Sequence, residues 1–418
     1  MLNFGLATLF FLPVIESFNR KTGFIFLLFG SLLFAIDVFR GQKIKFDIIE
    51  TTWLILLAIF SFSILNSLSY IRSFTETLRY LSYFFIFISF RNAENKKELT
   101  NFLFSFVIIN SLILTGFAFL SSFHFFKGLI PKNTMNLYFS NFGHNRLSDI
   151  LIFSIPLSAG LIIKSTEKRK RILYWCVLIL FTISLFLTLG RGAIFSLTLA
   201  TYLILYISGK NKAVMTHLTS GMESIFKLSI IFGVFAIIYI SINFIYSNFL
   251  QANPQYQKFS KPAIFELRLE YLRQATIAIK KYPYFGTGLD TFRYTSMKYQ
   301  SQPHTWSFYT HNHFLEIFSE TGIIGGVIFS LLITLLILYA SSNLRIGLYS
   351  DEYILKLTIF IAMTASAIHS FIDYGWHFLS VFMLFFISSA LLTAKSLDSS
   401  ISLKKGYKNL KIFCRGKF

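Results

Sequence analysis

The feature that most constrains this fold is a series of apolar segments, each long enough to cross a bilayer, separated by short charged stretches. A helix needs about 17–25 mainly apolar residues to cross the hydrocarbon core of a membrane. The chain is 54% apolar and only 14% charged. In soluble domains about a quarter of all residues are charged, and these residues allow the surface to be solvated. No alternating ten-residue segments indicate a membrane barrel. The sequence therefore predicts an all-α polytopic membrane protein.

Charged residues divide this single integral membrane domain, 1–418, into about twelve candidate transmembrane helices. They cover residues 2–16, 22–39, 51–70, 78–90, 102–122, 147–163, 172–189, 192–208, 228–249, 313–340, 355–372 and 378–394. No basic stretch of a signal peptide precedes the first segment, so we expect it to be retained in the membrane. An even number of spans places both termini on the same side.

Basic residues in the short loops predict the orientation. More than half of the 39 lysine and arginine residues fall in loops that share the side of the N-terminus, including the basic tail 395–418. Short cytoplasmic loops are enriched in Lys and Arg, so we expect both termini to be cytoplasmic. A short loop at 123–146 and a long loop at 250–312 then lie outside. The same asymmetry explains the net charge of +20, and we expect no nucleic-acid partner.

Cysteine usage predicts neither a disulfide nor a metal site. Cys176 lies inside an apolar run and Cys414 in the basic tail, so the two are not placed to meet. Neither belongs to a spacing typical of zinc ligands.

Residues 264–281 of the long loop show the apolar periodicity of an amphipathic helix, which Pro283, Gly286 and Gly288 would end. At about 100° per residue, Arg268 falls near the middle of the apolar stripe, where a solvated arginine would not be placed. Two interpretations stay open. Its guanidinium either reaches lipid headgroups or pairs with a carboxylate, or it is held over a cavity to bind an anion such as a pyrophosphate.

Two further arginines lie at boundaries that we expect to be external. Arg191 stands between Gly190 and Gly192, where two spans meet without a loop, and small neighbours allow a ligand or another backbone to approach closely. Arg146 comes just before a span. Each is either a membrane-end anchor or part of an anion site. Several such cations on one face favour a lipid-linked phosphate as the ligand.

A histidine motif, Thr310-His311-Asn312-His313, opens the span 313–340. Thr310 or Asn312 is suited to cap that helix. The positive end of a helix disfavours a second positive charge on an imidazole, so a histidine there tends to stay neutral and able to accept a proton. These are the properties of a general base. His311 is our candidate, with His313 as the alternative, although for His313 we favour a hydrogen-bonded interfacial role.

Three carboxylates accompany these histidines. Glu316 and Glu320 share a helical face with His313, at positions i, i+3 and i+7. Carboxylates this deep in a span are functional candidates, or they pair with an arginine that holds helices together. Asp373 lies in the short turn between the last two spans, and it is suited to orient a histidine or to balance an arginine.

Together these stretches resemble the O-antigen ligase and polymerase family of lipid-linked glycan transferases. The resemblance covers roughly residues 140–380 and includes a histidine motif, an external-loop signature that follows an arginine-bearing helix, and a hinge arginine motif. The matching residues are His311-Asn312-x9-Gly322 with Gly325, Pro283-x-x-Gly286-x-Gly288-x-x-x-Phe292, and Leu189-Gly190-Arg191-Gly192-Ala193. Some ligases continue with Gly-Thr-Tyr after the glycines, whereas this chain has Gly326-Val327, which leaves the subfamily open.

The resemblance implies a glycosyltransferase of lipopolysaccharide biosynthesis in the bacterial inner membrane, with a periplasmic active site. The donor would be a glycan on undecaprenyl pyrophosphate, and the acceptor of a ligase would be a sugar hydroxyl of lipid A–core. The transfer would be inverting and would need no metal or other cofactor. The resemblance further implies that His311 takes the acceptor proton while Arg191, Arg268 and Arg146 hold the pyrophosphate. The supporting residues would be Asn312, His313, Glu316, Glu320, Asp373, Gly286, Gly288 and Gly322.

Other functions differ from a ligase in features that the sequence shows. A polymerase that joins repeat units more often has two sizeable external loops, whereas here one loop dominates. A protein O-oligosaccharyltransferase often carries more sequence after its last span. A transporter for a lipid-linked solute would place charges at the middle of the bilayer, whereas the charges here gather at the external boundary. We therefore expect a ligase.

Overall fold

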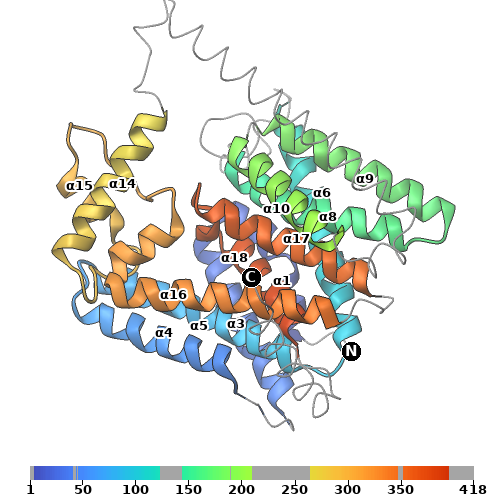
Figure 1. Cartoon of the computed structure of the whole chain (residues 1–418), viewed down its shortest axis with the longest axis horizontal. Coiled ribbons are helices and arrows are strands. Elements are labelled where there is room, and N and C mark those ends of the chain that lie inside the picture. The colour runs from blue at the N-terminus through green and yellow to red at the C-terminus, as the bar shows by residue number, and fades with distance from the viewer. Residues whose placement is uncertain are drawn as a thin grey trace, which may run out of the picture.

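The computed structural model describes residues 4–40, 44, 46–122, 144–188, 190–209, 264–346 and 352–394 (Figure 1). All regular secondary structure in these ranges is helical, which confirms the all-α polytopic membrane fold. The predicted span 228–249, the tail 395–418 and most of the loop 123–146 lie outside the described residues.

The described helices agree with the predicted spans, and each span other than 228–249 coincides with a helix or a pair of helices. In chain order the helices are α1 (Phe4–Phe10), α2 (Leu12–Phe18), α3 (Arg20–Phe39), α4 (Ile48–Leu65), α5 (Tyr70–Asn92), α6 (Lys96–Ser122), α8 (His144–Lys164), α9 (Lys168–Leu187), α10 (Arg191–Gly209), α14 (Ile264–Lys281), α15 (Phe292–Tyr299), α16 (His313–Ile346), α17 (Tyr353–Ser370), η2 (Gly375–His377) and α18 (Leu379–Thr393). Seven of them, α3, α4, α6, α8, α9, α16 and α17, are both long enough and apolar enough to cross a bilayer.

Helix α5 differs most from its predicted span, 78–90, because it begins at Tyr70 and ends at Asn92. The predicted span was too short because hydropathy excludes the charged side chains that lie near both ends of this helix. The structure buries Glu76, Arg79 and Arg91 among neighbouring helices, whereas Arg72 stays partly exposed and pairs with Asp290. Arg79 is 1% exposed, pairs with Glu76 and donates to the carbonyl of His377 at 3.1 Å. A helix that lies inside the bundle tolerates such charges because each one has a partner.

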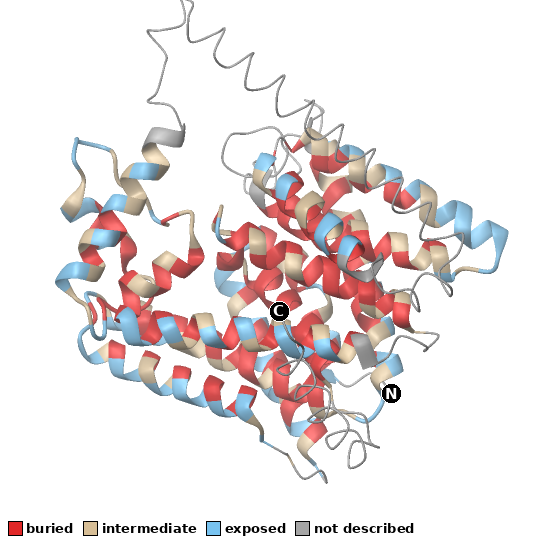
Figure 2. Cartoon of the chain, viewed as in Figure 1, coloured by how far each residue is buried: buried red, intermediate tan, exposed pale blue. Residues whose placement is uncertain are grey.

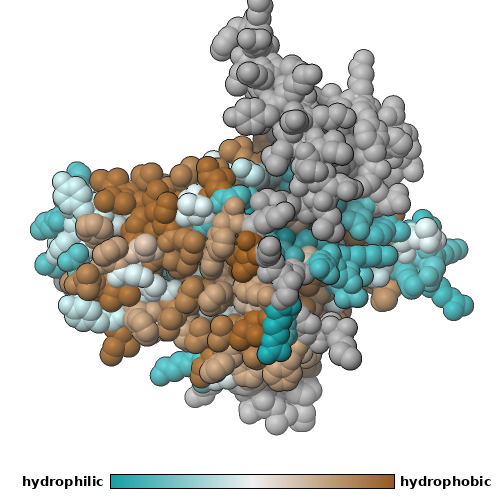
Figure 3. Space-filling model, turned by 90° about the horizontal axis from the view of Figure 1, so that it is seen from below, coloured by the Kyte–Doolittle hydropathy of each residue, from teal (hydrophilic) through white to brown (hydrophobic). Residues whose placement is uncertain are grey.

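The surface is arranged as expected for a membrane protein. Buried residues gather where helices face one another, while α4 and α16 carry exposed residues along their outer sides (Figure 2). Many of these exposed residues are apolar, among them Ile55 and Leu338. Hydrophobic surface occupies much of the space between two hydrophilic ends (Figure 3). One end holds α14 and α15 together with the turns 66–69 and 371–378, which contact this segment; we call it the loop end of the bundle.

The predicted amphipathic helix is confirmed as α14, which runs from Ile264 to Lys281. Ala275 and Ala278 of the predicted apolar stripe are fully buried, whereas Arg273 on the opposite side is exposed. Helix α14 packs on α16, which turns its apolar face toward the bundle. Arg268 therefore faces the bundle, and its side chain stays 34% exposed.

The chain after α14 is locked onto α16 by backbone contacts. The amide of Ile323 donates to the carbonyl of Pro283 at 2.7 Å, and the amide of Gly288 donates to the carbonyl of Glu320 at 2.8 Å. Both contacts surround Gly322, whose φ of 71° interrupts the helical path of α16. The two segments thus form one unit that sets where the loop lies.

Glycine is required where these two backbones meet. Gly286 has a φ of +67°, and a Cβ there would lie 2.2 Å from the carbonyl carbon of Glu320. A Cβ at Gly322 would lie 2.3 Å from the carbonyl carbon of Tyr284. Side chains at either position would force the segments apart, and the left-handed conformation adds strain of its own.

We predict that Gly286→Ala destabilises the protein by about 2–4 kcal/mol, because it combines left-handed strain with a backbone clash. The measurement is thermal unfolding of the purified protein in detergent. Gly116→Ala is the matched control, since a Cβ at Gly116 meets nothing within 4 Å. Equal melting temperatures for the two variants would contradict this account of the contact.

Candidate active site

Three predicted site residues meet at the loop end. Nδ1 of His311 lies 2.9 Å from Oδ1 of Asp373, and a guanidinium nitrogen of Arg268 lies 3.6 Å from Oδ2 of the same carboxylate. Burial alone would raise the pKa of Asp373, but the hydrogen bond with His311 and the nearby positive groups lower it to about 2. Asp373 is therefore a carboxylate at neutral pH, and it both orients the histidine and balances the arginine.

The backbone and two tyrosines fix the His311 ring. Its φ of 57° lies in the left-handed region, which turns the side chain away from the course of α16. Tyr271 stacks on the ring at 5.8 Å between centroids, and Tyr374 meets it edge-on at 4.9 Å. The side chain stays 21% exposed. Within the described residues nothing bonds to Nε2. With Asp373 on Nδ1, the favoured tautomer leaves Nε2 open to accept a proton.

His313 occupies a different environment from His311. It is 1% exposed, and its Nε2 lies 3.1 Å from the hydroxyl of Tyr80. The rings of Phe329 and Trp376 surround it within 6 Å of its centroid. His313 is hydrogen-bonded, as we favoured, but it lies buried inside the bundle and not at the membrane interface. Of the two histidines, His311 is therefore the better placed base.

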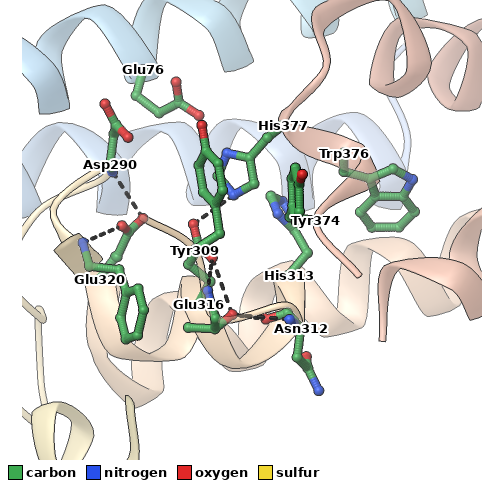
Figure 4. A network of polar contacts seen from close by, with 12 residues as sticks. Glu76, Asp290, Tyr309, Asn312, His313, Glu316, Glu320, Tyr374, Trp376 and His377 are labelled. Carbon is green, nitrogen blue, oxygen red and sulfur yellow. Dashed lines mark hydrogen bonds and ion pairs between the residues drawn. The ribbon is translucent and has the colours of Figure 1, made fainter. Parts of the chain in front are cut away.

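Glu316 holds Thr310, the first residue of the histidine motif, and no arginine of the described residues pairs with it. One of its oxygens accepts from the amide of Thr310 at 2.9 Å and from its hydroxyl at 3.1 Å. The other lies 2.6 Å from Nε2 of His377 (Figure 4). The hydroxyl of Thr310 also donates to the carbonyl of Asn312, whose side chain accepts from the amide of Leu315 and so caps α16 as predicted.

Glu320 likewise pairs with backbone amides and with no arginine in the part of the chain that the structure describes, which corrects that interpretation. Its two oxygens accept from the amides of Asp290, Thr291 and Phe292 at 2.8–2.9 Å (Figure 4). These amides open α15 and have no acceptor inside that helix, so a carboxylate satisfies them and complements the helix dipole. Glu320 therefore attaches the loop before α15 to α16 from inside the bundle.

Arg146 lies in the bundle, away from solvent. It is 7% exposed, pairs with Glu16 at 3.0 Å and donates to the carbonyl of Pro13 at 2.9 Å. Glu16 also accepts from the amides of Leu379 and Ser380, which begin α18. These contacts give Arg146 a structural role that joins α2, α8 and α18, while its predicted contact with a pyrophosphate stays a prediction.

Arg191 begins α10 and is exposed. The neighbouring glycines serve close packing, as the sequence indicated. A Cβ at Gly190 would lie 2.9 Å from the side chain of Ser148, and one at Gly192 would lie 3.0 Å from Nε2 of His369. Arg191 therefore stands beside the end of α17 that leads into Asp373. Leu189, the first residue of this motif, lies outside the described residues.

Two parts of this region were not assigned from the sequence. Arg20 lies 3.3 Å from the hydroxyl of Tyr309 and 3.4 Å from the carbonyl of His377. Asp149 pairs with His369 at 2.6 Å, and both side chains are less than 5% exposed. The signal for the second pair was present, because charged residues inside apolar spans are functional or paired by default. Only the fold shows that these two meet.

The site as described consists of one base candidate, one carboxylate and arginines. Among the residues that the structure describes, no group of three or more His, Cys, Asp or Glu side chains is placed to hold a metal ion. The metal-independent mechanism stays a prediction.

A comparison with protein families matches residues 176–330 to the family described as O-antigen ligase. This region contains α10, α14 and His311, and it confirms the resemblance that the motifs suggested. Arg146 and Asp373 lie outside the matched region. No curated protein matches the chain at a significant level.

We predict that loss of Arg146 lowers the stability of the protein strongly, whereas loss of Arg191 hardly changes it. Arg146→Gln leaves the buried Glu16 carboxylate without its cation and costs about 3–5 kcal/mol of stability, whereas Arg191→Gln changes stability by less than about 0.5 kcal/mol because the residue is exposed. Thermal unfolding in detergent measures both. Full stability of Arg146→Gln would contradict its structural role.

Proposed function

We propose that this chain, whose residues 176–330 match the O-antigen ligase family, is an O-antigen ligase. It transfers a glycan from undecaprenyl pyrophosphate to a sugar hydroxyl of lipid A–core, at the periplasmic face of the inner membrane and with both termini in the cytoplasm. The family supports a glycosyltransferase that uses a lipid-linked glycan. Within this family, the predominance of one long loop, 250–312, favours a ligase over a polymerase.

The observation that carries this proposal is the shared carboxylate of Asp373, which contacts His311 at 2.9 Å and Arg268 at 3.6 Å. It places a proton acceptor and a cation side by side at the loop end. Glycosyl transfer from a pyrophosphate needs both, because a proton leaves the acceptor hydroxyl while negative charge develops on the leaving group.

In the proposed reaction the acceptor hydroxyl oxygen attacks the anomeric carbon of the donor. The bond from that carbon to the pyrophosphate oxygen breaks, and its electron pair leaves with undecaprenyl pyrophosphate. The hydroxyl proton moves to Nε2 of His311, while Asp373 stabilises the imidazolium that forms. Direct attack inverts the anomeric configuration, and no metal takes part.

Arg268 and Arg191 supply the positive charge for the leaving group. The guanidinium of Arg268 is one-third exposed, and its Nε has no hydrogen-bond partner among the described residues. It can therefore add phosphate contacts while it stays near Asp373. A planar guanidinium suits two phosphate oxygens at once. Arg191 adds a second, exposed cation at the start of α10.

We predict that His311→Asn lowers transfer by about 10²–10⁴-fold, the usual contribution of a general base. The measurement is product formation by purified protein from undecaprenyl-pyrophosphate-linked glycan and lipid A–core. Asparagine tolerates the left-handed backbone of this position. His304→Asn is the matched control, because His304 is an exposed histidine of the same loop with a φ of 67°. A fully active His311→Asn variant would refute the mechanism.

Deletion of the gene in its native host separates the ligase from its alternatives. Lipopolysaccharide without polymer, with long chains left on undecaprenyl pyrophosphate, is the result that the ligase predicts. A core capped by a single repeat unit would instead identify a polymerase. Unchanged lipopolysaccharide together with an unglycosylated secreted protein would identify a protein O-oligosaccharyltransferase.

A further inference from the structure

We propose that a groove at the end of the bundle opposite the loop end binds an anionic phospholipid of the surrounding membrane. Side chains of α6, α8 and α9 and of the start of α17 line this groove. It lies away from the candidate active site, and the proposal depends on neither the donor nor the acceptor of the proposed reaction.

The groove lies where α8 turns back into α9. Helix α8 packs against α6, α9 and α17, and its turn into α9 lies at the right of Figure 1, far from α14 and α15 at the left. The cavity among these helices measures about 520 Å³, within the range of about 300–1,000 Å³ that is usual for small-molecule sites. Phe104 and Leu355 in its lining are buried, whereas Ile109 is 42% exposed in the middle of a predicted span. The groove is therefore open to the lipid around the bundle.

The lining changes from polar to apolar along the helices. On α6 it runs from Asn101 to Ile109, about 12 Å at about 1.5 Å per residue. Lys164 at the end of α8 and Lys170 at the start of α9 lie at the same end of the bundle as Asn101. Leu161 and the lining of α6 beyond Asn101 then lead toward the middle of the bilayer. This order matches a phospholipid, whose headgroup stays at the membrane surface while its tails enter the hydrocarbon core.

Positive charge surrounds the polar end of the groove. The stretch 164–171 carries five basic residues and one acidic residue, Glu167. Glu167 pairs with Lys170 at 2.7 Å, while Lys164 forms no ion pair within the part of the chain that the structure describes. The excess of positive charge favours an anionic headgroup over a zwitterionic one. Basic pockets between transmembrane helices bind anionic headgroups in this way, because lysine places its apolar stem along the helix and its ammonium at the phosphate.

The test is lipid binding by the purified full-length protein after native lipid has been removed in detergent. Native mass spectrometry measures the binding of phosphatidylglycerol and of phosphatidylcholine at equal concentrations. We expect phosphatidylglycerol to bind at least about tenfold more tightly, because each basic residue near an anionic headgroup contributes. It should also raise the melting temperature, since it binds the folded protein.

Two double variants with the same loss of charge separate a defined site from general attraction. Lys164→Gln with Lys170→Gln changes the lining of the groove, whereas Arg169→Gln with Arg171→Gln removes two charges of the same stretch from outside the lining. We expect the lysine variant to weaken phosphatidylglycerol binding by about tenfold, and the arginine variant by less than about threefold. All four side chains are exposed, so both variants should keep their fold.

A further variant changes the shape of the groove and not its charge. Ser105 lies in the lining on α6 and is exposed, so Ser105→Trp narrows the groove without a clash in the core. We expect it to weaken phosphatidylglycerol binding by about tenfold as well, because the tail loses its place between the helices.

The outcomes decide for or against the site. Weakened binding in the lysine variant and in Ser105→Trp, with binding kept in the arginine variant, supports it. Equal weakening by the two double variants, or wild-type affinity in Ser105→Trp, overturns it, because attraction to the basic stretch alone would then explain the binding. Displacement of phosphatidylglycerol by an equal concentration of inorganic phosphate also overturns it, since the site would then recognise an anion and not a lipid. The proposed glycosyl transfer is unaffected by any of these results.

Discussion

Buried carboxylates need partners in a medium without water, and at the loop end of the bundle this need determines how the helices are joined. Glu16 pairs with Arg146 and accepts from the first amides of α18. Glu320 accepts from the amides at the start of α15. Asp373 contacts both His311 and Arg268. An unpaired charge here would cost several kcal/mol. Each carboxylate therefore fixes one connection of a loop or of a helix end. The candidate active site is the connection at which one partner, His311, remains partly open to solvent.

Much of the fold could be predicted from the sequence because lipid imposes strong patterns. Apolar length gives the spans, and periodicity gave α14 with the same limits that the structure shows. The position of Arg268 in an apolar stripe correctly placed it against the bundle. The glycines at 286 and 322 could be recognised as special, but the clash that requires them, between two segments 36 residues apart, depends on the tertiary structure.

The partners of the charges could not be predicted. An arginine was an equally reasonable partner for Glu316 and Glu320, yet one contacts His377 and Thr310 and the other binds backbone amides. Arg146 looked like a cation at the membrane surface, and its partner Glu16 comes from the first helices of the chain. Hydropathy says where a charge is unusual, whereas packing between distant helices decides what satisfies it. For the same reason the contact between Asp149 and His369 could not be predicted from the sequence.

The central claim is that Asp373 holds His311 with its proton on Nδ1 and leaves Nε2 as the acceptor. Nitrogen-15 NMR of histidine-labelled protein in nanodiscs at pH 8 tests this directly, with the His311 signals assigned by their loss in His311→Asn. Our account predicts a protonated Nδ1 and an unprotonated Nε2, and a mixture of both tautomers in Asp373→Asn. A neutral His311 with its proton on Nε2 in the wild-type protein would contradict it.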